Sequence, residues 1–508
     1  MKQKRTKVIL ALILPVIIIL HLSICTILYF FEPISYYAPD LSLSDFSFDL
    51  YKKFDFTKDK DFYIKQLNHT DIVAAPGDER LKYVDNTILL ISEPDANYDD
   101  VAPLIENING NICGYIDVVN FYQVDLVDKN YNDLINICSD LNNNDLINIA
   151  IIDYFEETPV AETSSEVYTD TYYAYQRDMI NLYDAWNLTK NITTDVTIGM
   201  IDCPVYLSHH DINVINSDEY SDEILNNPLI QGFNSHGTHV AGIMTASYHG
   251  KTPGIYPGAQ IYSENGINNS LSYWIASTVN MIVNNNIKAI NISMGYNSYI
   301  PVSASLGCEF SKQYITSENE FFEAVLKNVL ASGYEFLICL SAGNESNTSL
   351  CKTNSDYFTY GEKENLRKWD IFDIFSSKPD YCDSEYQYLL TAIDDDDIRN
   401  RIIIVGSCDE KKVYSNFASA GAVVDIVAPG ENIYSTSYQI DYEHMSGTSM
   451  ASPFVTGTAA LLFSLNDSLS GEEVKEIIIK SSTETVNAYG FNYPLLNVGN
   501  AIDYTSTK

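Results

Sequence analysis

Basic residues are scarce in this chain. Its 508 residues include 30 Lys and Arg against 68 Asp and Glu, which gives a formal net charge of −38 at pH 7. Nucleic acids are bound mainly through Lys and Arg contacts to phosphate, so this balance argues against a nucleic-acid partner. We interpret the acidic excess as a property that keeps the protein soluble.

Metal-binding cysteine motifs are also lacking. None of the nine cysteines belongs to a CxxC pair or a Cys/His cluster, so we expect no zinc site. Cys351 and Cys382 flank an acidic, aromatic insertion and are the best candidates for a disulfide, provided that this region lies outside the cell. Cys203, Cys339 and Cys408 follow or lie within apolar strands, where we expect buried free thiols.

A hydrophobic run extends from Val8 to Phe31. At about 1.5 Å per residue, a helix of this length spans a bilayer core, and four Lys and Arg residues among the first seven favour a cytoplasmic N-terminus. No Ala-x-Ala-like site follows the run, which favours an uncleaved anchor over a cleaved signal peptide, and the large Ile24 before Cys25 argues against lipidation. We expect membrane contact through residues 8–31 and the remainder outside the cell, or a secreted protein if the segment is cleaved.

The length suggests two or three domains. Residues 1–31 are expected to form the anchor or signal segment and residues 32–80 a spacer. Periodicity within residues 81–157 predicts the order β-α-β-β-α-β of a small ferredoxin-like α+β domain. Residues 158–171, rich in Thr, Ser and Glu, are expected to be a linker. The predicted strands are 87–92, 111–118, 121–126 and 146–153, and the predicted helices are 97–108 and 131–141.

In residues 172–508, apolar strands alternate with helices. This alternation predicts an α/β domain with a mostly parallel sheet and helices on both faces. Two polar stretches, 299–318 and 347–397, resemble insertions, and surface decoration is favoured over a role in covering a cleft or binding a partner. The predicted strands are 196–201, 261–264, 288–292, 336–340, 401–405 and 423–427, and the predicted helices are 236–246, 271–283, 319–330, 448–464 and 471–480.

One serine is placed for nucleophilic chemistry. The stretch Met-Ser-Gly-Thr-Ser-Met-Ala-Ser-Pro, residues 445–453, precedes an apolar helical run. Ser449 would lie at the helix N-terminus, where backbone N–H groups and the helix dipole favour developing negative charge. A serine hydroxyl needs a base to take its proton and donors to stabilise the oxyanion. Ser446 and Ser452 are the alternatives in the same stretch.

Three other segments offer the partners that Ser449 needs. The motif Asn-Ser-His-Gly-Thr-His-Val-Ala-Gly supplies His236 as a base, with His239 as the alternative, where a helix is expected to begin. Three nearby histidines carry no motif, and we expect them at the surface: His209, His210 and His249. Asp202 ends an apolar β-branched strand, at the edge where catalytic groups collect in open α/β sheets. Asn344 follows another apolar strand, and its carboxamide is a candidate oxyanion donor.

These segments resemble those of the subtilisin-like serine peptidases. The likeness includes Ile-Asn-Ile-Ser-Met-Gly at residues 290–295 and Val-Ala-Pro-Gly at residues 427–430, and it covers most of residues 175–500. In this family the first histidine of His-Gly-Thr-His is the base, which selects His236. Only Ser449 follows Gly-Thr and precedes Met-Ala-Ser-Pro as the family serine does. The Asp-His-Ser order is also that of subtilisin.

The resemblance implies a role for each residue. Ser449 would be the nucleophile, His236 the general base, and Asp202 the residue that orients the imidazole. The side chain of Asn344 and the backbone N–H of Ser449 would form the oxyanion hole. No cofactor is required for this chemistry, and no catalytic metal is expected.

Substrate-binding residues follow from the same resemblance. Ser293, Met294 and Gly295 would form the extended edge that pairs with the substrate backbone. Ala342 and Gly343 would leave room for a side chain, which we expect to be apolar. The implied function is a membrane-tethered, self-processed serine endopeptidase that acts on peptides or proteins.

The family often carries a domain before the catalytic one that acts as a chaperone and inhibitor. Residues 81–157 would be this prodomain and hence a partner of the catalytic domain, and a cut within the linker would release the mature enzyme. The alternative is a free-standing binding domain with no inhibitory role.

Two departures from the family pattern matter. The aspartate is usually followed by Ser or Thr and then Gly, but here Cys203 and Pro204 follow it. Cys203 could lie under the triad and make the enzyme sensitive to thiol reagents, while Pro204 lacks an N–H and could shift Asp202. A pseudoprotease that binds peptides without cutting them is therefore the second hypothesis. The family's frequent calcium loop is represented by residues 246–252, which lack the carboxamide oxygens such a site uses; a structural calcium ion is left open, without named ligands.

Overall fold

The computed structural model describes a large part of the chain. The expected anchor, most of the expected spacer, the expected linker, Gly295 and the pair Cys351 and Cys382 lie outside the described residues. The described residues are 60–65, 67, 69–76, 78–156, 175–189, 196–216, 231–267, 269–294, 307–344, 389–438 and 442–506.

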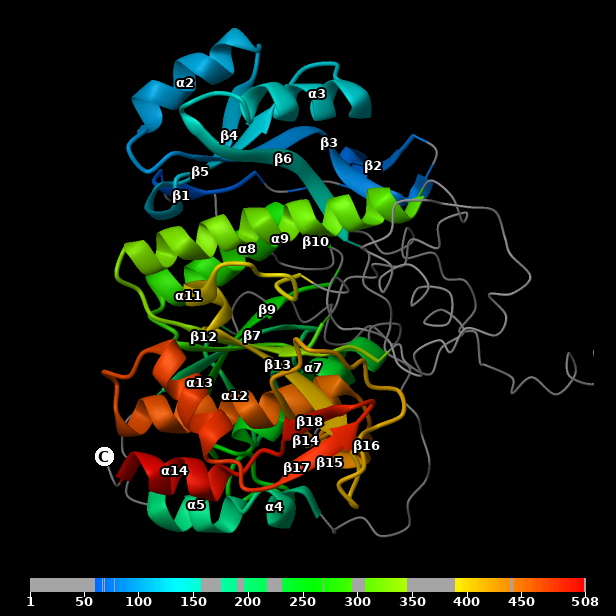
Figure 1. Cartoon of the computed structure of the whole chain (residues 1–508), viewed down its shortest axis with the longest axis vertical. Coiled ribbons are helices and arrows are strands. Elements are labelled where there is room, and N and C mark those ends of the chain that lie inside the picture. Colours follow the sequence, from blue (N-terminus) through cyan, green and yellow to red (C-terminus); the bar gives the residue numbers. More distant parts are fainter. Residues whose placement is uncertain are drawn as a thin grey trace, which may run out of the picture. The chain divides into compact units, whose positions relative to one another are not determined.

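The first part of the described chain forms an antiparallel sheet with two helices (Figure 1). The strand order is β1-β4-β5-β3-β6-β10, with β2 beside β3. From β3 to β6 the elements follow the expected β-α-β-β-α-β order, but β3 begins at Asp78 rather than near residue 87, because the polar stretch before residue 87 pairs with β2. The elements are β1 (Phe62–Tyr63), a 3-10 turn (His69–Asp71), β2 (Ile72–Ala75), β3 (Asp78–Ser92), α2 (Tyr98–Asn107), β4 (Asn111–Ile116), a 3-10 turn (Asp117–Val119), β5 (Phe121–Asp125), α3 (Tyr131–Leu141) and β6 (Ile147–Glu156).

This sheet is buried on both faces. Successive strand residues point to opposite faces, and Ile88 and Leu90 of β3 belong to a core cluster that includes residues of α2 and α3. The alternate residue Leu89 is fully buried but lies outside that cluster. On β5, the ring of Phe121 meets the ring of Phe321 edge to face, with centroids 6.3 Å apart. The second face therefore packs against the part of the chain that follows.

The second part contains a parallel sheet of order β14-β13-β12-β11-β7-β9-β8. All six strand pairings in it are parallel, which confirms the predicted α/β fold. Continuous apolar runs such as Ile402–Val405 are typical of strands covered on both faces. The strands are β7 (Thr197–Asp202), β8 (Asn213–Val214), β9 (Gln260–Asn265), β11 (Ala289–Ile292), β12 (Leu337–Ser341), β13 (Ile402–Cys408) and β14 (Ile426–Pro429).

Helices cover both faces of the parallel sheet. Figure 1 shows α12 (Thr448–Leu465) and α7 (Gln231–Thr245) on one side and α8 (Leu271–Val279) and α9 (Gly307–Ala331) on the other. Residues 307–318, expected to be part of an insertion, instead extend α9. The remaining helices are α4 (Tyr175–Met179), α5 (Leu182–Thr189), a π-helical turn (Asn280–Asn284), α11 (Asp396–Arg399), α13 (Gly471–Lys480) and α14 (Val498–Ser506).

Three short pairings complete the described structure. A hairpin of β15 (Ile433–Thr436) and β16 (Tyr442–Met445) packs against α7, and a second hairpin joins β17 (Thr485–Ala488) to β18 (Phe491–Pro494). Strand β10 (Asn269–Ser270), which lies between β9 and α8 in the chain, pairs with β6 of the antiparallel sheet.

Helix α12 is central to the packing. Among the described residues it is the one helix long and apolar enough to cross a membrane, yet 94% of its most apolar stretch is buried inside the protein. It contacts β11, β12, β13 and β14. Its composition is therefore explained by its place in the core.

Candidate active site

Asp202 is the last residue of β7 and is fully buried at the carboxyl end of the parallel sheet. Its Oδ1 accepts a hydrogen bond from the backbone N–H of Cys203 at 2.6 Å and lies 2.7 Å from Nδ1 of His236. The structure therefore brings together the carboxylate and the imidazole that the sequence separates by 34 positions.

The contact fixes the state of the His236 ring. Because Asp202 Oδ1 is an acceptor, Nδ1 carries the proton and Nε2 is left as the basic nitrogen. Burial of the ring opposes its protonation, but the charge of Asp202 and the hydrogen bond outweigh burial and raise the pKa of His236. The ring is thus prepared to accept a proton at Nε2.

The glycine after His236 lets α7 approach β7 closely. A Cβ on Gly237 would lie 1.9 Å from the carbonyl oxygen of Cys203, a distance that no side chain tolerates. The next residue, Thr238, accepts a hydrogen bond from the backbone N–H of Tyr206 at 2.8 Å. The sequence predicted that a helix begins at His236. That prediction was wrong, because α7 begins at Gln231 and His236 lies inside it.

The second histidine of the motif, His239, has a structural role. Nε2 of His239 lies 2.9 Å from the carbonyl oxygen of Ile433 and 3.2 Å from that of Glu443, and it joins α7 to the β15–β16 hairpin. Burial lowers the pKa of His239 to about 3. The geometry thus places His236, not His239, beside Asp202. His209, expected at the surface, is also buried.

Ser449 is the second residue of α12, so its backbone N–H has no partner within the helix. Its Oγ donates to the carbonyl oxygen of Ser293 at 3.0 Å, and Ser293 Oγ donates to the carbonyl oxygen of Ser449 at 2.9 Å. Because β7 and β11 pair Ile201 with Ile292, Ser293 lies level with Asp202 at the sheet edge.

The hydroxyl of Ser449 does not yet contact the imidazole. Between the described residues Ser449 and His236 no hydrogen bond is formed, and the Ser449 hydroxyl is engaged by the carbonyl oxygen of Ser293. Catalytic hydrogen bonds are often loose without substrate. The other two serines have structural partners: Ser446 Oγ accepts from Asn432 N–H at 2.8 Å, and Ser452 Oγ donates to Asn291 Oδ1 at 2.9 Å.

The carboxamide of Asn344 is held in one orientation. Its Oδ1 accepts from the backbone N–H of Thr448 at 2.9 Å and from Thr448 Oγ1 at 3.0 Å. The amide nitrogen, the group that could donate to an oxyanion, is thereby turned away from Thr448. Gly343 adopts φ +104°, a conformation that favours glycine, and its N–H donates to Thr448 Oγ1 at 3.1 Å.

Ser293 and Met294 follow β11 at the edge of the sheet, and Ala342 is buried beside β12. Behind this edge lies an apolar cavity lined by residues of α8, β11, β12 and the segment before α11. Sequence reasoning missed Leu389 and Leu390, which close the cavity at the end of the predicted insertion. Leu390 has φ +66°, unusual for a bulky residue. The lining residues are Trp274, Ile292, Met294, Leu340, Leu389 and Leu390.

Residues 246–252, which stand where the family often has a calcium loop, are held by side chains. Both oxygens of the buried Asp211 are engaged, Oδ1 by Ser247 Oγ at 2.6 Å and Oδ2 by the hydroxyl of Tyr442. The ammonium group of Lys251 lies 4.7 Å from the centre of the Tyr442 ring.

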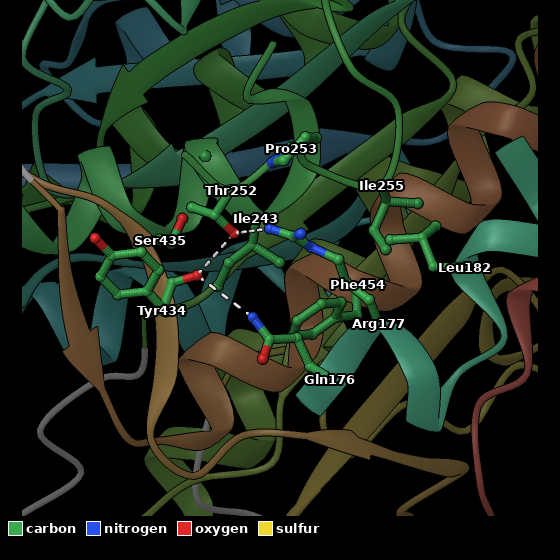
Figure 2. Close-up of a pocket in the computed structure, with 11 residues that line it drawn as sticks. Gln176, Arg177, Leu182, Ile243, Thr252, Pro253, Ile255, Tyr434, Ser435 and Phe454 are labelled. Atoms are coloured by element: carbon green, nitrogen blue, oxygen red, sulfur yellow. Dashed lines mark hydrogen bonds between the residues drawn. The ribbon is translucent and has the colours of Figure 1, made fainter. Parts of the chain in front are cut away.

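A second cation reaches the end of the same loop. Figure 2 shows the guanidinium of Arg177 pointing at Thr252, whose Oγ1 accepts a hydrogen bond at 2.5 Å. Thr252 in turn donates to the carbonyl oxygen of Tyr434 at 3.2 Å, which also accepts from Gln176. Two cationic side chains, beside one carboxylate whose two oxygens already accept hydrogen bonds, do not match the six to eight oxygen ligands that calcium takes.

Comparison with known proteins agrees with this geometry. Residues 193–499 match the sequence model of the subtilase family. The chain is 27% identical to subtilisin DY of Bacillus licheniformis over 309 residues, which covers 60% of this chain and 89% of the relative. It is 27% identical to a thermophilic serine proteinase of Bacillus sp. (strain AK1) over 375 residues, covering 70% and 76%.

A solved structure shares the fold. The epidermin leader peptide processing serine protease EpiP of Staphylococcus aureus superposes with a TM-score of 0.54 and 17% identity, covering 83% of this chain and 99% of that one. The family match spans every candidate catalytic residue and more than half of the chain. The chain therefore belongs to the subtilase family of serine endopeptidases.

Proposed function

We propose that this endopeptidase works through a triad of Asp202, His236 and Ser449. The observation that carries the proposal is the 2.7 Å contact between Asp202 Oδ1 and His236 Nδ1, and Ser449 lies at the start of α12, the helix that packs against α7. Ser449 attacks the scissile carbonyl, His236 takes its proton at Nε2 and later gives it to the leaving amine, and an acyl-enzyme forms and is hydrolysed. Asp202 holds the tautomer and stabilises the imidazolium.

The alternative is a pseudoprotease, suggested by Pro204. The geometry favours the enzyme, because the Asp202 carboxylate keeps its bonds to His236 and to the Cys203 N–H despite the proline. A serine-directed phosphonate probe separates the two. Labelling of the wild type that disappears in Ser449→Ala supports the enzyme, whereas folded, processed wild type that takes up no label supports the pseudoprotease.

Asn344 is the proposed side-chain oxyanion donor. Replacing it by alanine should lower kcat by about 10²–10³ with little change in KM, which is the effect known from subtilisin itself for the loss of one such donor. Thr448→Val removes one of the two bonds that hold the carboxamide, and we expect a loss of roughly 10-fold. Steady-state kinetics on a peptide substrate measure both; equal losses in the two variants would contradict the assigned roles.

We propose that the N-terminal α+β domain is an inhibitor of the catalytic domain. Strand β6 pairs Phe155 with Ser270 and Glu156 with Asn269, directly before α8. The neighbouring Gly266 N–H donates to the carbonyl oxygen of Asp202 at 2.9 Å. Strand β6 thus ends beside the segment that follows β9, and β9 pairs Asn265 with Asp202. A free-standing binding domain would not require this placement.

Self-processing is the second part of this proposal. We propose a cut within residues 158–171, which follow β6 and precede α4 in the chain. N-terminal sequencing of the active form tests it: a start within that range supports the proposal, and a start before residue 81 contradicts it. The same experiment shows whether residues 8–31 are kept as an anchor.

Docking of the N-terminal domain should weaken as pH rises. Asp153 accepts from Ser272 N–H at 3.2 Å, Ser272 Oγ at 2.8 Å and Gln123 Nε2 at 3.0 Å. Burial outweighs these bonds and raises the pKa of Asp153 from 3.8 to about 6. Because the pKa of Asp153 is raised, its protonated form favours docking. This contribution to docking is complete below the ordinary pKa of 3.8 and is lost as pH rises through about 6.

The affinity of the catalytic domain for the N-terminal domain should fall roughly 100-fold between about pH 4 and about pH 7. It is measured by diluting the processed enzyme with its N-terminal domain still bound and following the onset of activity at each pH. Asp153→Asn should remove most of the pH dependence, while Asp140→Asn, at an exposed position of α3, should leave it unchanged. An unchanged profile in Asp153→Asn would exclude this carboxyl as the cause.

Residues 246–252 should be stable without calcium, because Arg177 and Lys251 supply the positive charge there. A chelator should shift the midpoint of thermal unfolding by less than about 1 °C, since only a ligand bound to the native state raises stability. Arg177→Ala should lower the midpoint in both conditions. A chelator-sensitive midpoint that calcium restores would refute the proposal.

We propose that the enzyme acts outside the cell, tethered through residues 8–31. EpiP, by its name, is a protease that processes the leader peptide of epidermin, and a leader or pro-peptide of a secreted product is the substrate class we favour here. We propose an apolar side chain before the cut, with room for it beside Ala342 and Gly343, which follow β12 and have little or no side chain. Cleavage of a peptide library by the processed enzyme tests this preference.

A further inference from the structure

Cys203 occupies an unusual place beside the triad. It directly follows Asp202, at a position where the family usually has Ser or Thr, and it is buried as a free thiol. The sulfur, a carboxylate oxygen of Asp202 and a ring nitrogen of His236 all lie within 4.8 Å of one another. In the described part of the chain, these three residues form the one group of Cys, His and carboxylate side chains close enough together to hold a metal ion.

The Asp202 carboxylate has only half of its hydrogen bonds. Oδ1 has two partners, but the buried Oδ2 has none among the described residues. Pro204 has no N–H to offer it. An unpartnered, buried carboxylate oxygen is costly, and it is an acceptor that a cation would satisfy.

We propose that Asp202, Cys203 and His236 form an inhibitory site for a thiophilic divalent cation such as Zn²⁺. Thiolate, imidazole and carboxylate are all zinc ligands, and three protein ligands with a water molecule complete a tetrahedral site. Bonds of about 2.0–2.3 Å in a tetrahedron separate the ligand atoms by roughly 3.3–3.8 Å. This spacing lies between the present 2.7 Å contact and the 4.8 Å limit.

Metal binding would remove the general base. The sulfur binds the cation as a thiolate, and the thiol proton goes to solvent. The cation takes Nδ1 of His236, and the ring proton moves from Nδ1 to Nε2. A protonated Nε2 cannot accept the proton of Ser449, so hydrolysis stops.

The test uses the processed, metal-free enzyme and zinc chloride. Zinc should inhibit peptide hydrolysis by the wild type, and a chelator should restore the rate. Cys203→Ser should need at least about 100-fold more zinc, each rate being compared with that variant's own metal-free rate. Cys408→Ala removes a buried thiol of β13 that contacts Met179 and should keep the wild-type zinc response.

A second measurement does not depend on activity. Cadmium chloride should produce one equivalent of cadmium–thiolate ultraviolet absorption in the wild type and in Cys408→Ala, and none in Cys203→Ser or Cys203→Ala. Zinc inhibition that is equal in wild type and Cys203→Ser, or absent from the wild type, would overturn the site. So would a cadmium signal that survives the loss of Cys203.

Discussion

Replacing Ser449 by alanine should abolish peptide hydrolysis and leave the chain at full length. Subtilisin itself loses a factor on the order of 10⁶ in kcat without its nucleophile, and we carry this size over from that relative. Here the serine lies at the start of α12, and its hydroxyl donates to the carbonyl oxygen of Ser293. Self-processing uses the same hydroxyl, so the variant should retain the N-terminal domain on the same chain. Mass spectrometry and a peptide assay measure the two effects.

A matched control is Ser446→Ala. Ser446 lies three residues earlier, and its hydroxyl accepts from Asn432 N–H, so its loss should affect stability slightly and processing not at all. Processing of purified Ser449→Ala at the wild-type site would show that another protease makes the cut. Retained peptide hydrolysis in that variant would show that Ser449 is not the nucleophile.

Elements with strong local signals were predicted well. Helices α3 and α13 have the predicted bounds, because each begins with a capping box. The N-cap side chain accepts a hydrogen bond from the backbone three residues later, and the carboxylate there accepts one from the N-cap backbone N–H: Asn130 with Asp133, and Ser470 with Glu473. The buried parallel strands were found within one to three residues, since their continuous apolar runs need no knowledge of the neighbours.

Features that depend on distant parts of the chain were not predicted. The two-residue strand β10 exists because β6 lies beside it, and no local pattern marks it. His209 looked like a surface residue, but it packs edge to face on Tyr442, which is far away in sequence. The early start of α7, which places His236 inside the helix, likewise has no capping signal in the sequence.

The candidate site shows the same division. Short motifs predicted which side chains would meet, and Asp202 and His236 do so at 2.7 Å. The direction of the Ser449 hydroxyl could not be predicted, because it depends on the carbonyl group of Ser293 in another strand. The sequence also could not predict that Asp202 Oδ2 has no hydrogen-bond partner among the described residues, because this depends on how the whole edge of the sheet packs.

Replacing Asp202 by asparagine should lower kcat by about 10⁴ at neutral pH. With its oxygen in the place of Oδ1, the introduced carboxamide keeps the bonds to the Cys203 N–H and to His236 Nδ1, but it is neutral and cannot stabilise the imidazolium. With its NH₂ group in that place, it loses the bond to the Cys203 N–H and favours the wrong tautomer of His236. The change preserves shape and burial, so the loss reports on the charge and the hydrogen bond rather than on packing. Unchanged thermal unfolding is the control that separates these causes.

The pH profile of the same variant tests the electrostatics. In the wild type, Asp202 raises the pKa of His236 against the effect of burial, so kcat/KM should rise with pH through a value above 6.5, the ordinary histidine value. In Asp202→Asn the charge is gone and burial remains, so the pKa of His236 falls and the acidic limb of the profile moves to lower pH. A limb that stays in place would mean that Asp202 does not set the pKa of the base, and the 2.7 Å contact would then have only a structural role.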